Sequence, residues 1–516
     1  MKKIRINRFI YMAAAFSLLL SGCSKEDSYQ ESTAHTVSKA FTLQVNASAY
    51  SSAGTRASDT GITTTFASED KLGIIVTHKD GSVEHFVYTY DGSSWTSSTP
   101  FYYNYQDSYA AYYPYKEDLN GKTLSEVKSA FTPPTDQSDY ATGYAASDLM
   151  TCKNAILDKT DWKLQITLTH AFSMLRFPAD IPVKSRCEDG NTYQYSLPAT
   201  DIVFHIGDTP YKPWMGNDGY ARLIVGNNSN SDISVKSSYT LQGKQTETSG
   251  MVTSFASGQY YTLIPQVQDL GDYKFSDVRV GDFYCKNSDG NGFVIPHEAS
   301  LPDELKNNCI GIVFHTGKHN NDMSNYSNPL TTNGPCIPKD ENGAPQVHGY
   351  AVALADATDN GYCKWGVYGT SLGNYPTDES GNPINNYGGD TDWSGYHYTQ
   401  NMKTAAEKDG GSLTSNTEAG YPAAYYALNY ETTVPAPANS SGWFLPAISQ
   451  MWQVYQIRNS FSNIGGSNLQ SDWYWSSSEF YYRPGDFGLY VDVDNGYVRY
   501  DNKSNRLSYV RPVLAF

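Results

Sequence analysis

The sequence has 516 residues and carries 37 basic against 53 acidic side chains, which gives a formal charge of -16. Four of the basic residues lie in the first eight positions, and without them 33 basic residues face 53 acidic ones, a charge of -20. A chain this acidic repels nucleic acid and anionic lipid, so we expect no nucleic-acid partner. Tyr is unusually abundant at 43 copies, and with many Gly, Ser, Thr and Asn residues it favours short strands joined by polar turns.

Residues 1-22 have the pattern of a removable export signal. The apolar run from Phe9 to Gly22 follows basic residues and is too short to span roughly 30 Å of hydrocarbon as a helix. It ends in Leu20-Ser21-Gly22-Cys23, which resembles a bacterial lipoprotein signal. The resemblance implies cleavage before Cys23, acylation of its thiol and anchoring in the outer membrane. The alternative is an ordinary secretory peptide followed by an incidental Cys.

Residues 23-37 are predicted to form a polar linker. Its start, Ser24-Lys25-Glu26-Asp27, resembles the export signal of surface-exposed lipoproteins of the Bacteroides type, although a solvated charged linker explains the same residues. After Cys23 no apolar segment approaches the length of a membrane span, so we expect the remaining chain to be soluble.

The next region alternates apolar and polar residues in short stretches. Phe41, Leu43, Val45 and Ala47 alternate with polar neighbours, which predicts a half-buried strand over 39-49. A loop of small residues, 51-58, then holds a single basic residue, Arg56, and can enter a protease cleft. Further strands are predicted over 72-78, 85-90, 108-115, 162-170 and 172-177, with a hairpin turn at Asp91-Gly92. This regular series indicates a β-sandwich.

Five short motifs in this region resemble the fimbrillin family of Bacteroides-type pili: Gly54-Thr55-Arg56-Ala57, Asp70-Lys71-Leu72-Gly73, Ala110-Ala111-Tyr112-Tyr113-Pro114-Tyr115, Asp148-Leu149-Met150 and Leu168-Thr169-His170-Ala171-Phe172. The resemblance covers residues 38-178 and implies a transthyretin-like β-sandwich. It also implies a second sandwich, for which residues 179-270 offer strands over 201-206, 221-225 and 260-264.

The family resemblance further implies cleavage between Arg56 and Ala57 by a trypsin-like protease. The cut would release the lipidated segment together with the first strand. A sandwich that loses a strand exposes unpaired backbone groups and apolar pockets, and a strand of another subunit can fill them. The alternative is that Arg56 is an ordinary loop residue.

Residues 271-516 have longer loops rich in Gly, Asn and Asp. We expect strands over 280-284, 309-314 and 348-354, helices over 402-408 and after Pro446, and a hairpin over 489-500 turning at Asn495-Gly496. Ile448, Met451, Trp452 and Tyr455 are expected on one face of the second helix. Three motifs resemble C-type-lectin-like domains of Bacteroides-type surface proteins: Gly442-Trp443-Phe444-Leu445-Pro446, Tyr474-Trp475-Ser476-Ser477-Ser478-Glu479 and Val510-Arg511-Pro512-Val513. The predicted fold is mainly β, two transthyretin-like sandwiches followed by an α+β lectin-like domain.

Catalysis and metal binding are not expected. The chain has no Cys after Cys363 and no His after His397, so its final third lacks the obvious nucleophiles and bases. The Glu-Pro-Asn, Gln-Pro-Asp and Trp-Asn-Asp signatures of calcium-dependent sugar binding do not occur. Asp492, Asp494 and Asn495 are expected to decorate a hairpin, and the pair His315 and His319 lacks a helix that would place both on one face. We therefore predict no cofactor and no metal.

Six Cys besides Cys23 allow fifteen pairings, and we expect structural disulfides or buried thiols without choosing among them. Between Gly361 and Gln400 the loop carries many aromatic residues, the composition of an adaptable recognition surface. The alternative is that half of these rings fill the core of the domain. The ligand-binding candidates are Trp365, Tyr387, Trp393, Tyr396 and Tyr398.

These patterns together predict a cell-surface fimbrial subunit, a tip adhesin with other fimbrial subunits and an extracellular glycan or protein ligand as partners. The predicted last strand closes the lectin-like domain, so the subunit would accept a strand and donate none. The alternative is a surface lipoprotein that keeps its lipid on Cys23, does not polymerise, and binds a glycan or glycoprotein.

Overall fold

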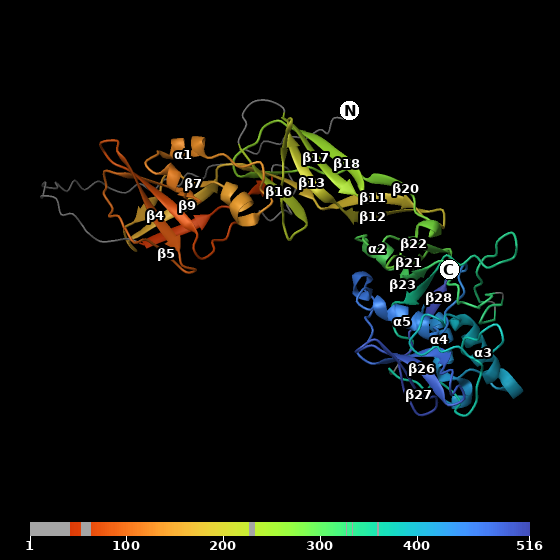
Figure 1. Ribbon diagram of the computed structural model, residues 1–516. Coiled ribbons are helices and arrows are strands. Elements are labelled where there is room, and N and C mark those ends of the chain that lie inside the picture. The colour runs from red at the N-terminus through yellow and green to blue at the C-terminus, as the bar shows by residue number, and fades with distance from the viewer. Residues whose placement is uncertain (1–41, 53–62, 227–232, 327, 333, 359–360) are drawn as a thin grey trace, which may run out of the picture. The chain divides into compact units, whose positions relative to one another are not determined.

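The computed structural model describes residues 42-52, 63-226, 233-326, 328-332, 334-358 and 361-516 (Figure 1). The chain divides into two compact units. Unit 1 holds the described residues up to Ile181 together with Pro198–Gln266, and unit 2 holds Pro182–Leu197 and Val267–Phe516. Strands dominate, so the predicted mainly β class is confirmed. The segment 179-270 is shared between the units, and the finer division into two sandwiches and a lectin-like domain stays a prediction.

The first sheet of unit 1 contains β1 (Thr42–Ala47), β3 (Lys71–Thr77), β4 (Val83–Tyr90), β5 (Trp95–Thr96), β6 (Ser108–Tyr113), β7 (Met150–Cys152), β8 (Ile156–Asp158) and β9 (Lys163–His170). Its order is β1-β9-β7-β6-β3-β4-β5, and β8 also pairs with β9. After Lys163, buried and exposed residues alternate along β9, as one face on the core requires. In β3 the five central residues are all buried, so both faces of this strand are covered.

Two of the predicted motifs meet in this sheet. Gly73 of β3 pairs with Tyr112 of β6, and a Cβ atom at Gly73 would lie 2.4 Å from the Tyr112 ring. Tyr112 is fully buried. A side chain at position 73 would therefore displace a core ring, which explains why Gly is needed there.

A second sheet of unit 1 has the order β15-β16-β10-β19-β2, and a third has the order β14-β13-β17-β18. The bounds of the second sheet are β2 (Ser51–Ser52), β10 (Ser173–Pro178), β15 (Trp214–Met215), β16 (Tyr220–Val225) and β19 (Gln259–Thr262). Those of the third are β13 (Thr200–Ile206), β14 (Thr209–Tyr211), β17 (Ile233–Leu241) and β18 (Lys244–Val252).

The connection from β6 to β7 is helical, which the sequence patterns did not predict. It contains Glu117–Leu119, α1 (Leu124–Ala130), Tyr140–Tyr144 and Ala145–Ser147. At the start of α1, Thr123 Oγ1 accepts a hydrogen bond from the backbone N–H of Glu126, and the Glu126 carboxylate accepts one from the N–H of Thr123. This capping box satisfies two backbone donors that a short helix leaves free.

Unit 2 contains three sheets and several helices (Figure 1). The first sheet is β12 (Thr192–Pro198), β11 (Asp180–Arg186) and β20 (Gln268–Asp272). The second has the order β22 (Gly292–Ile295), β21 (Phe283–Lys286), β23 (Cys309–Thr316), β24 (Gly349–Ala353) and β28 (Val513–Ala515). The third is β25 (Trp473–Glu479), β26 (Phe487–Asp492) and β27 (Tyr497–Asn502).

The helices of unit 2 are α2 (Asp303–Lys306), α3 (Gly395–Glu407), α4 (Pro422–Asn429) and α5 (Ile448–Gln456), with single turns at Phe275–Asp277, Lys408–Gly410, Glu418–Gly420, Tyr430–Thr432 and Phe461–Ile464. α3 begins well before the predicted start at Met402. The buried stripe of α5 is Ile448, Met451 and Val454, whereas Trp452, expected on the same face, is 38% exposed. Within the described parts of the chain, every helix is too short or too polar for a membrane span.

Two charged residues of the sequence motifs in unit 2, Glu479 and Arg511, anchor loops against its sheets. Glu479 is fully buried with its carboxylate 2.5 Å from Nζ of Lys503, and it accepts hydrogen bonds from the backbone N–H groups of Leu372 and Asn374. Arg511 is also buried, and its Nε donates to Asp356 at 2.7 Å. The charged residues of these two motifs therefore act in packing and loop anchoring.

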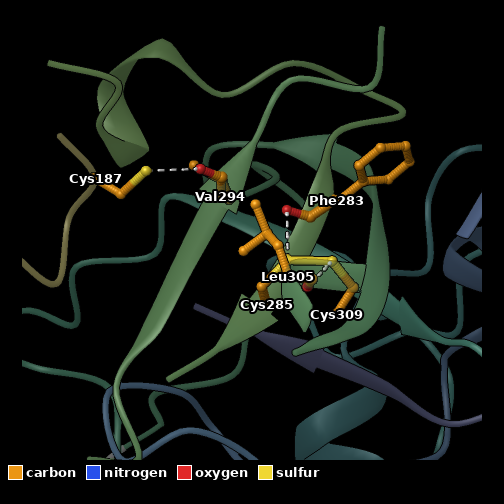
Figure 2. Close-up of a disulfide and its surroundings, with 6 residues drawn as sticks. All are labelled: Cys187, Phe283, Cys285, Val294, Leu305 and Cys309. Carbon is orange, nitrogen blue, oxygen red and sulfur yellow. Dashed lines mark hydrogen bonds between the residues drawn. A yellow bond between two sulfur atoms is a disulfide. The ribbon is translucent and has the colours of Figure 1, made fainter. Parts of the chain in front are cut away.

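One disulfide joins neighbouring strands of the second sheet. Cys285 of β21 and Cys309 of β23 are directly paired across the strands and bonded through sulfur, as Figure 2 shows. The Cys187 thiol is buried nearby and donates to the Val294 carbonyl at 3.5 Å, and burial raises its pKa to about 12. The other described free thiols are Cys152, Cys336 and Cys363. The structure thus selects one pairing, which the sequence left open.

Candidate functional site

Three predicted site residues lie outside the described parts of the chain. Cys23 precedes residue 42, and Arg56 and Ala57 fall within 53-62. Their predicted roles in lipid attachment and cleavage stay predictions. The structure does describe residues 42-52, which come directly before the Arg56 loop.

Residues 42-52 occupy the edges of two sheets in unit 1. β1 runs parallel to β9, from Thr42 opposite Lys163 to Ala47 opposite Leu168. β2 runs parallel to β19. β1 and β2 are each the edge strand of their sheet. Leu43, Val45 and Ala47 pack on the apolar cluster that contains Leu164, Ile166 and Leu168. Removing this segment would therefore uncover backbone groups on β9 and β19 and an apolar groove beside β9.

Four of the five ring residues predicted to contact a ligand are buried in unit 2. Trp365 and Trp393 are fully buried, and Tyr396 and Tyr398 are 1% and 3% exposed. Their polar atoms find partners within the fold: Trp365 Nε1 donates to the carbonyl of Ser476 at 2.7 Å, and Trp393 Nε1 donates to Asp390 at 2.6 Å. The prediction that these four rings form a ligand surface is wrong for this structure, because the loop folds them into the core, as the packing alternative supposed.

Tyr387 is the exception and lies in an exposed aromatic cluster. It is 44% exposed, and its ring centre lies 5.8 Å from that of Phe480 and 5.7 Å from that of Tyr500. Phe480 and Tyr500 stack in parallel with centres 4.3 Å apart. Tyr482 is the most exposed member, at 75%. We call this cluster the Tyr387 patch; it consists of Tyr387, Phe480, Tyr481, Tyr482, Phe487 and Tyr500.

A buried amide joins the two loops that carry the Tyr387 patch. Asn386, fully buried, donates to the carbonyl of Glu479 at 2.9 Å and accepts from the backbone N–H of Tyr481 at 3.3 Å. The β26–β27 hairpin adds Tyr500, which pairs with Leu489 across the strands. The rings are thus positioned by the fold before any ligand arrives, which lowers the entropic cost of binding.

The charged groups beside the patch are paired with each other. Arg483 binds Asp486 and lies 4.7 Å from the centre of the Phe487 ring, while Arg499 lies 3.0 Å from Asp492. The patch therefore offers ring faces and phenol hydroxyls as its binding chemistry, with ion pairs at its rim. Groups of this kind can bind a ligand through ring stacking and hydrogen bonds. The run Phe480-Tyr481-Tyr482 before Arg483-Pro484-Gly485 was the sequence signal for this surface.

One group of described residues has the donor spacing of a metal site, Asp282 with His297 and Glu298. Its donor atoms already have partners. Asp282 accepts from the Tyr273 hydroxyl, the Arg279 N–H and the His297 ring, and the Arg279 guanidinium holds both oxygens of Glu298 at 2.7 and 2.6 Å. A cation would have to displace this arginine, so the group is better understood as an ion-pair network.

The other metal candidates also have structural roles. Asp492 accepts hydrogen bonds from the backbone N–H of Asp494 and the side chain of Asn495, so these residues form the hairpin turn as predicted. His319 stacks on Trp393 with ring centres 4.1 Å apart and lies 3.2 Å from Asp390.

The described residues are mainly β, with residues 42-52 at the edges of two sheets and the Tyr387 patch exposed. Residues 55-294 match the family described as fimbrillin-like, so this region is fimbrillin-like, as the sequence motifs predicted. The chain is also 24% identical over 491 residues to a Bacteroides ovatus protein that bears the name fimbrium tip subunit Fim1C, covering 82% of this chain and 84% of that one. The chain is thus a distant homologue of Fim1C, and both matches are to fimbrial proteins rather than to enzymes.

Two solved structures show weaker likeness. A fimbrial protein from Bacteroides ovatus is 19% identical, covers 92% of this chain and 99% of its own, and superimposes with a TM-score of 0.39. A protein described as a cell adhesion protein, from Bacteroides uniformis, is 17% identical, covers 44% of this chain and 92% of its own, and has a TM-score of 0.28. At these TM-scores the likeness supports no conclusion about function.

Proposed function

We propose that the protein is a subunit of a cell-surface fimbria, placed at the fibre tip, that presents a recognition domain to an extracellular glycan or protein. The observation that carries this proposal is the position of residues 42-52 at the edges of two sheets, directly before the Arg56 loop. The fimbrillin-like region and the relative named as a fimbrium tip subunit support it.

Assembly follows from these edges. Lipid on Cys23 delivers the precursor to the outer surface, and cleavage between Arg56 and Ala57 frees residues 42-52 to leave. The uncovered edges of β9 and β19 then accept an extended segment from a neighbouring subunit, which pairs through backbone hydrogen bonds and fills the apolar positions of Leu43, Val45 and Ala47.

The tip position rests on β28. Val513, Leu514 and Ala515 are fully buried, β28 pairs with β24, and Val513 also bridges to Phe444. Donating this strand to a neighbour would break the core of unit 2. A subunit of this kind accepts a strand and does not offer β28 in return, which favours a position at the end of a fibre.

N-terminal sequencing of the fibre-associated protein tests the proposal. We expect Ala57 as the mature N-terminus and co-purification with other fimbrial subunits. Arg56→Gln should leave the uncut, lipidated form on the cell, whereas the control Lys159→Gln, at an exposed basic residue elsewhere in unit 1, should not. Gold labelling along whole fibres would contradict the tip position.

The recognition part of the proposal assigns residues 271-516 to a C-type-lectin-like domain and its ligand surface to the Tyr387 patch. Replacing Tyr482 and Tyr500 with Ala should lower cell or glycan-array binding at least tenfold, because ring stacking is lost while the core is untouched. Tyr497→Ala is the matched control, an exposed Tyr on the same strand as Tyr500 but outside the patch. Equal binding by all three proteins would remove the patch from the proposal.

The competing function is a lipoprotein that keeps its anchor, does not polymerise and binds a glycan or glycoprotein. The signal Leu20-Ser21-Gly22-Cys23 is the observation in its favour. A mature N-terminus at Cys23 under all conditions, with no fimbrial subunit co-purifying, would establish it.

A further inference from the structure

Tyr50 lies between the two edge strands of the N-terminal segment and points into the core of unit 1. It is 2% exposed and belongs to an apolar cluster that includes Tyr112 of β6, Met174 of β10 and Tyr260 of β19. By contrast, the inward residues of β1 are only partly buried. Among residues 42-51, whose burial the structure describes, Tyr50 is therefore the most deeply buried side chain.

The phenol of Tyr50 is held by a specific pair of polar residues. Its hydroxyl donates to Asp148 Oδ1 at 2.6 Å, and Nδ1 of His170 lies 2.8 Å from the same oxygen. The Tyr50 and His170 rings stack with centres 3.6 Å apart and planes 21° from parallel. Burial, with the Asp148 charge, raises the pKa of Tyr50 well above its ordinary value, which keeps the hydroxyl protonated as a donor.

Asp148 and His170, which hold the Tyr50 ring, are positioned by parts of the chain outside residues 42-52. His170 ends β9 and pairs with Met150 of β7, which places it beside Asp148 without help from residues 42-52. The His170 side chain is fully buried and that of Asp148 is 13% exposed. Nε2 of His170 is buried without a hydrogen-bond partner among the residues that the structure describes. If residues 42-52 left, Asp148 and His170 would remain and would line the space that the Tyr50 ring had occupied.

We propose that Asp148 and His170 form a docking site for a tyrosine side chain on the segment of a second fimbrial subunit that replaces residues 42-52. The inference rests on the proposed function and adds the kind of strand that fits. That strand needs one stretch parallel to β9, a tyrosine that turns inward, and a short stretch parallel to β19, the pattern in which Ala47, Tyr50 and Ser51–Ser52 follow one another here.

The chemistry discriminates among side chains. A phenylalanine fills the ring space and stacks on His170 but leaves Asp148 without its second donor. A hydrogen bond to a charged acceptor is worth enough that its loss lowers affinity about tenfold or more. An alanine also leaves the ring space empty, and the loss of the buried ring adds to the loss of the hydrogen bond.

Peptide exchange tests the inference. The purified full chain is cut at Arg56 with trypsin, the cut is verified by mass, and fluorescent peptides of residues 42-52 are added. We expect the native peptide to bind, Tyr50→Phe to bind about tenfold more weakly or worse, and Tyr50→Ala at least a hundredfold more weakly. Gln44→Ala, at an exposed position of β1, is the matched control and should bind like the native peptide.

Hydrogen exchange in the uncut full chain gives a second readout that needs no peptide release. The amides of residues 42-52 should exchange about tenfold faster in Tyr50→Phe and unchanged in Gln44→Ala. Equal peptide affinities together with unchanged exchange would overturn the inference. Both measurements use purified protein, so a chain that discriminates among peptides but never enters fibres counts against the proposed function and not against the docking site.

Discussion

A buried ion pair, Lys503 with Glu479, holds the loop after Trp365 against the third sheet of unit 2. Nζ of Lys503 lies 2.5 Å from the Glu479 carboxylate, donates to the Thr370 carbonyl at 2.9 Å and sits 4.4 Å from the centre of the Trp365 ring. Both side chains are fully shielded from water. Removing one partner would leave an uncompensated charge in a place that water cannot reach.

Lys503→Met should therefore lower the free energy of unfolding of unit 2 by about 3–5 kcal/mol. Urea denaturation followed by Trp fluorescence measures this. The control Lys403→Met removes an exposed pair with Glu407 and should cost less than about 1 kcal/mol. Similar losses in both variants would contradict the account of the buried pair.

Asp392 makes the stability of unit 2 depend on pH. It is buried, Asn386 donates to it at 2.9 Å, and burial raises its pKa to about 6 from an ordinary value of 3.8. Below pH 3.8 the carboxyl is protonated in both states and has no effect on stability. As the pH rises toward 6, the unfolded chain loses this proton first, so the folded state becomes less stable by up to about 3 kcal/mol.

Asp392→Asn should remove that loss. Urea denaturation at intervals from pH 4 to pH 7 should show the free energy of unfolding of the wild type falling relative to the variant by up to about 3 kcal/mol. Asp289→Asn, at an exposed position of the same unit, should follow the wild type. A constant difference between wild type and Asp392→Asn at every pH would show that this carboxyl does not titrate in the range.

At the scale of elements, the disulfide links β21 to β23 and closes a loop with a sequence separation of 24 residues. The loop includes β22 and α2, so the bond restrains one edge of the second sheet in the unfolded chain. A cross-link over a loop of this size is worth roughly 2–4 kcal/mol, chiefly through the unfolded state.

Replacing Cys285 and Cys309 together by Ala should lower the free energy of unfolding of unit 2 by about 2–4 kcal/mol, and a reducing agent should lower the wild-type value toward that of the variant. Cys336→Ala, at a free and half-buried thiol, is the control and should keep the sensitivity to reduction. If a reducing agent leaves the wild-type free energy of unfolding unchanged, the disulfide does not stabilise unit 2.

At the scale of the whole molecule, two compact units imply two unfolding events. Calorimetry should resolve two transitions, because each unit has its own apolar clusters. Lys503→Met should lower the temperature of one transition, and Gly73→Ala, which drives a Cβ atom against the Tyr112 ring of unit 1, should lower the other. A single transition that both variants shift equally would show that the units unfold together.

Local sequence patterns predicted much of the secondary structure. The alternation along residues 162-170 predicted β9 nearly residue for residue, and Asn495-Gly496 predicted the turn between β26 and β27, where Gly496 has a φ of 72°. The α1 helix was missed, since its capping signal stands in a short segment between strands. The start of α3 was also missed, because its first turn is Gly395 and aromatic residues with weak helix preference.

The candidate site was less predictable than the fold. Of the five ring residues proposed from the sequence, Tyr387 alone reaches the surface to an extent that a ligand could use. Composition identifies a loop rich in aromatic residues, but it does not say which rings face water. The N–H groups of Trp365 and Trp393 stay paired in the core because Ser476 and Asp390 supply acceptors for them.

The sequence by itself determined the acidic character, the β-rich class, many strand positions and the fimbrillin-like motifs, because these depend on composition and on neighbours within a few residues. Only the tertiary structure decided the pairing of Cys285 with Cys309, the exposed Tyr387 patch and the receptor for Tyr50. Those features join residues far apart in the chain: Tyr50 and Asp148 are separated by 98 positions, and Asn386 and Tyr481 by 95. No local pattern encodes such a contact, since it exists only once the sheets have formed.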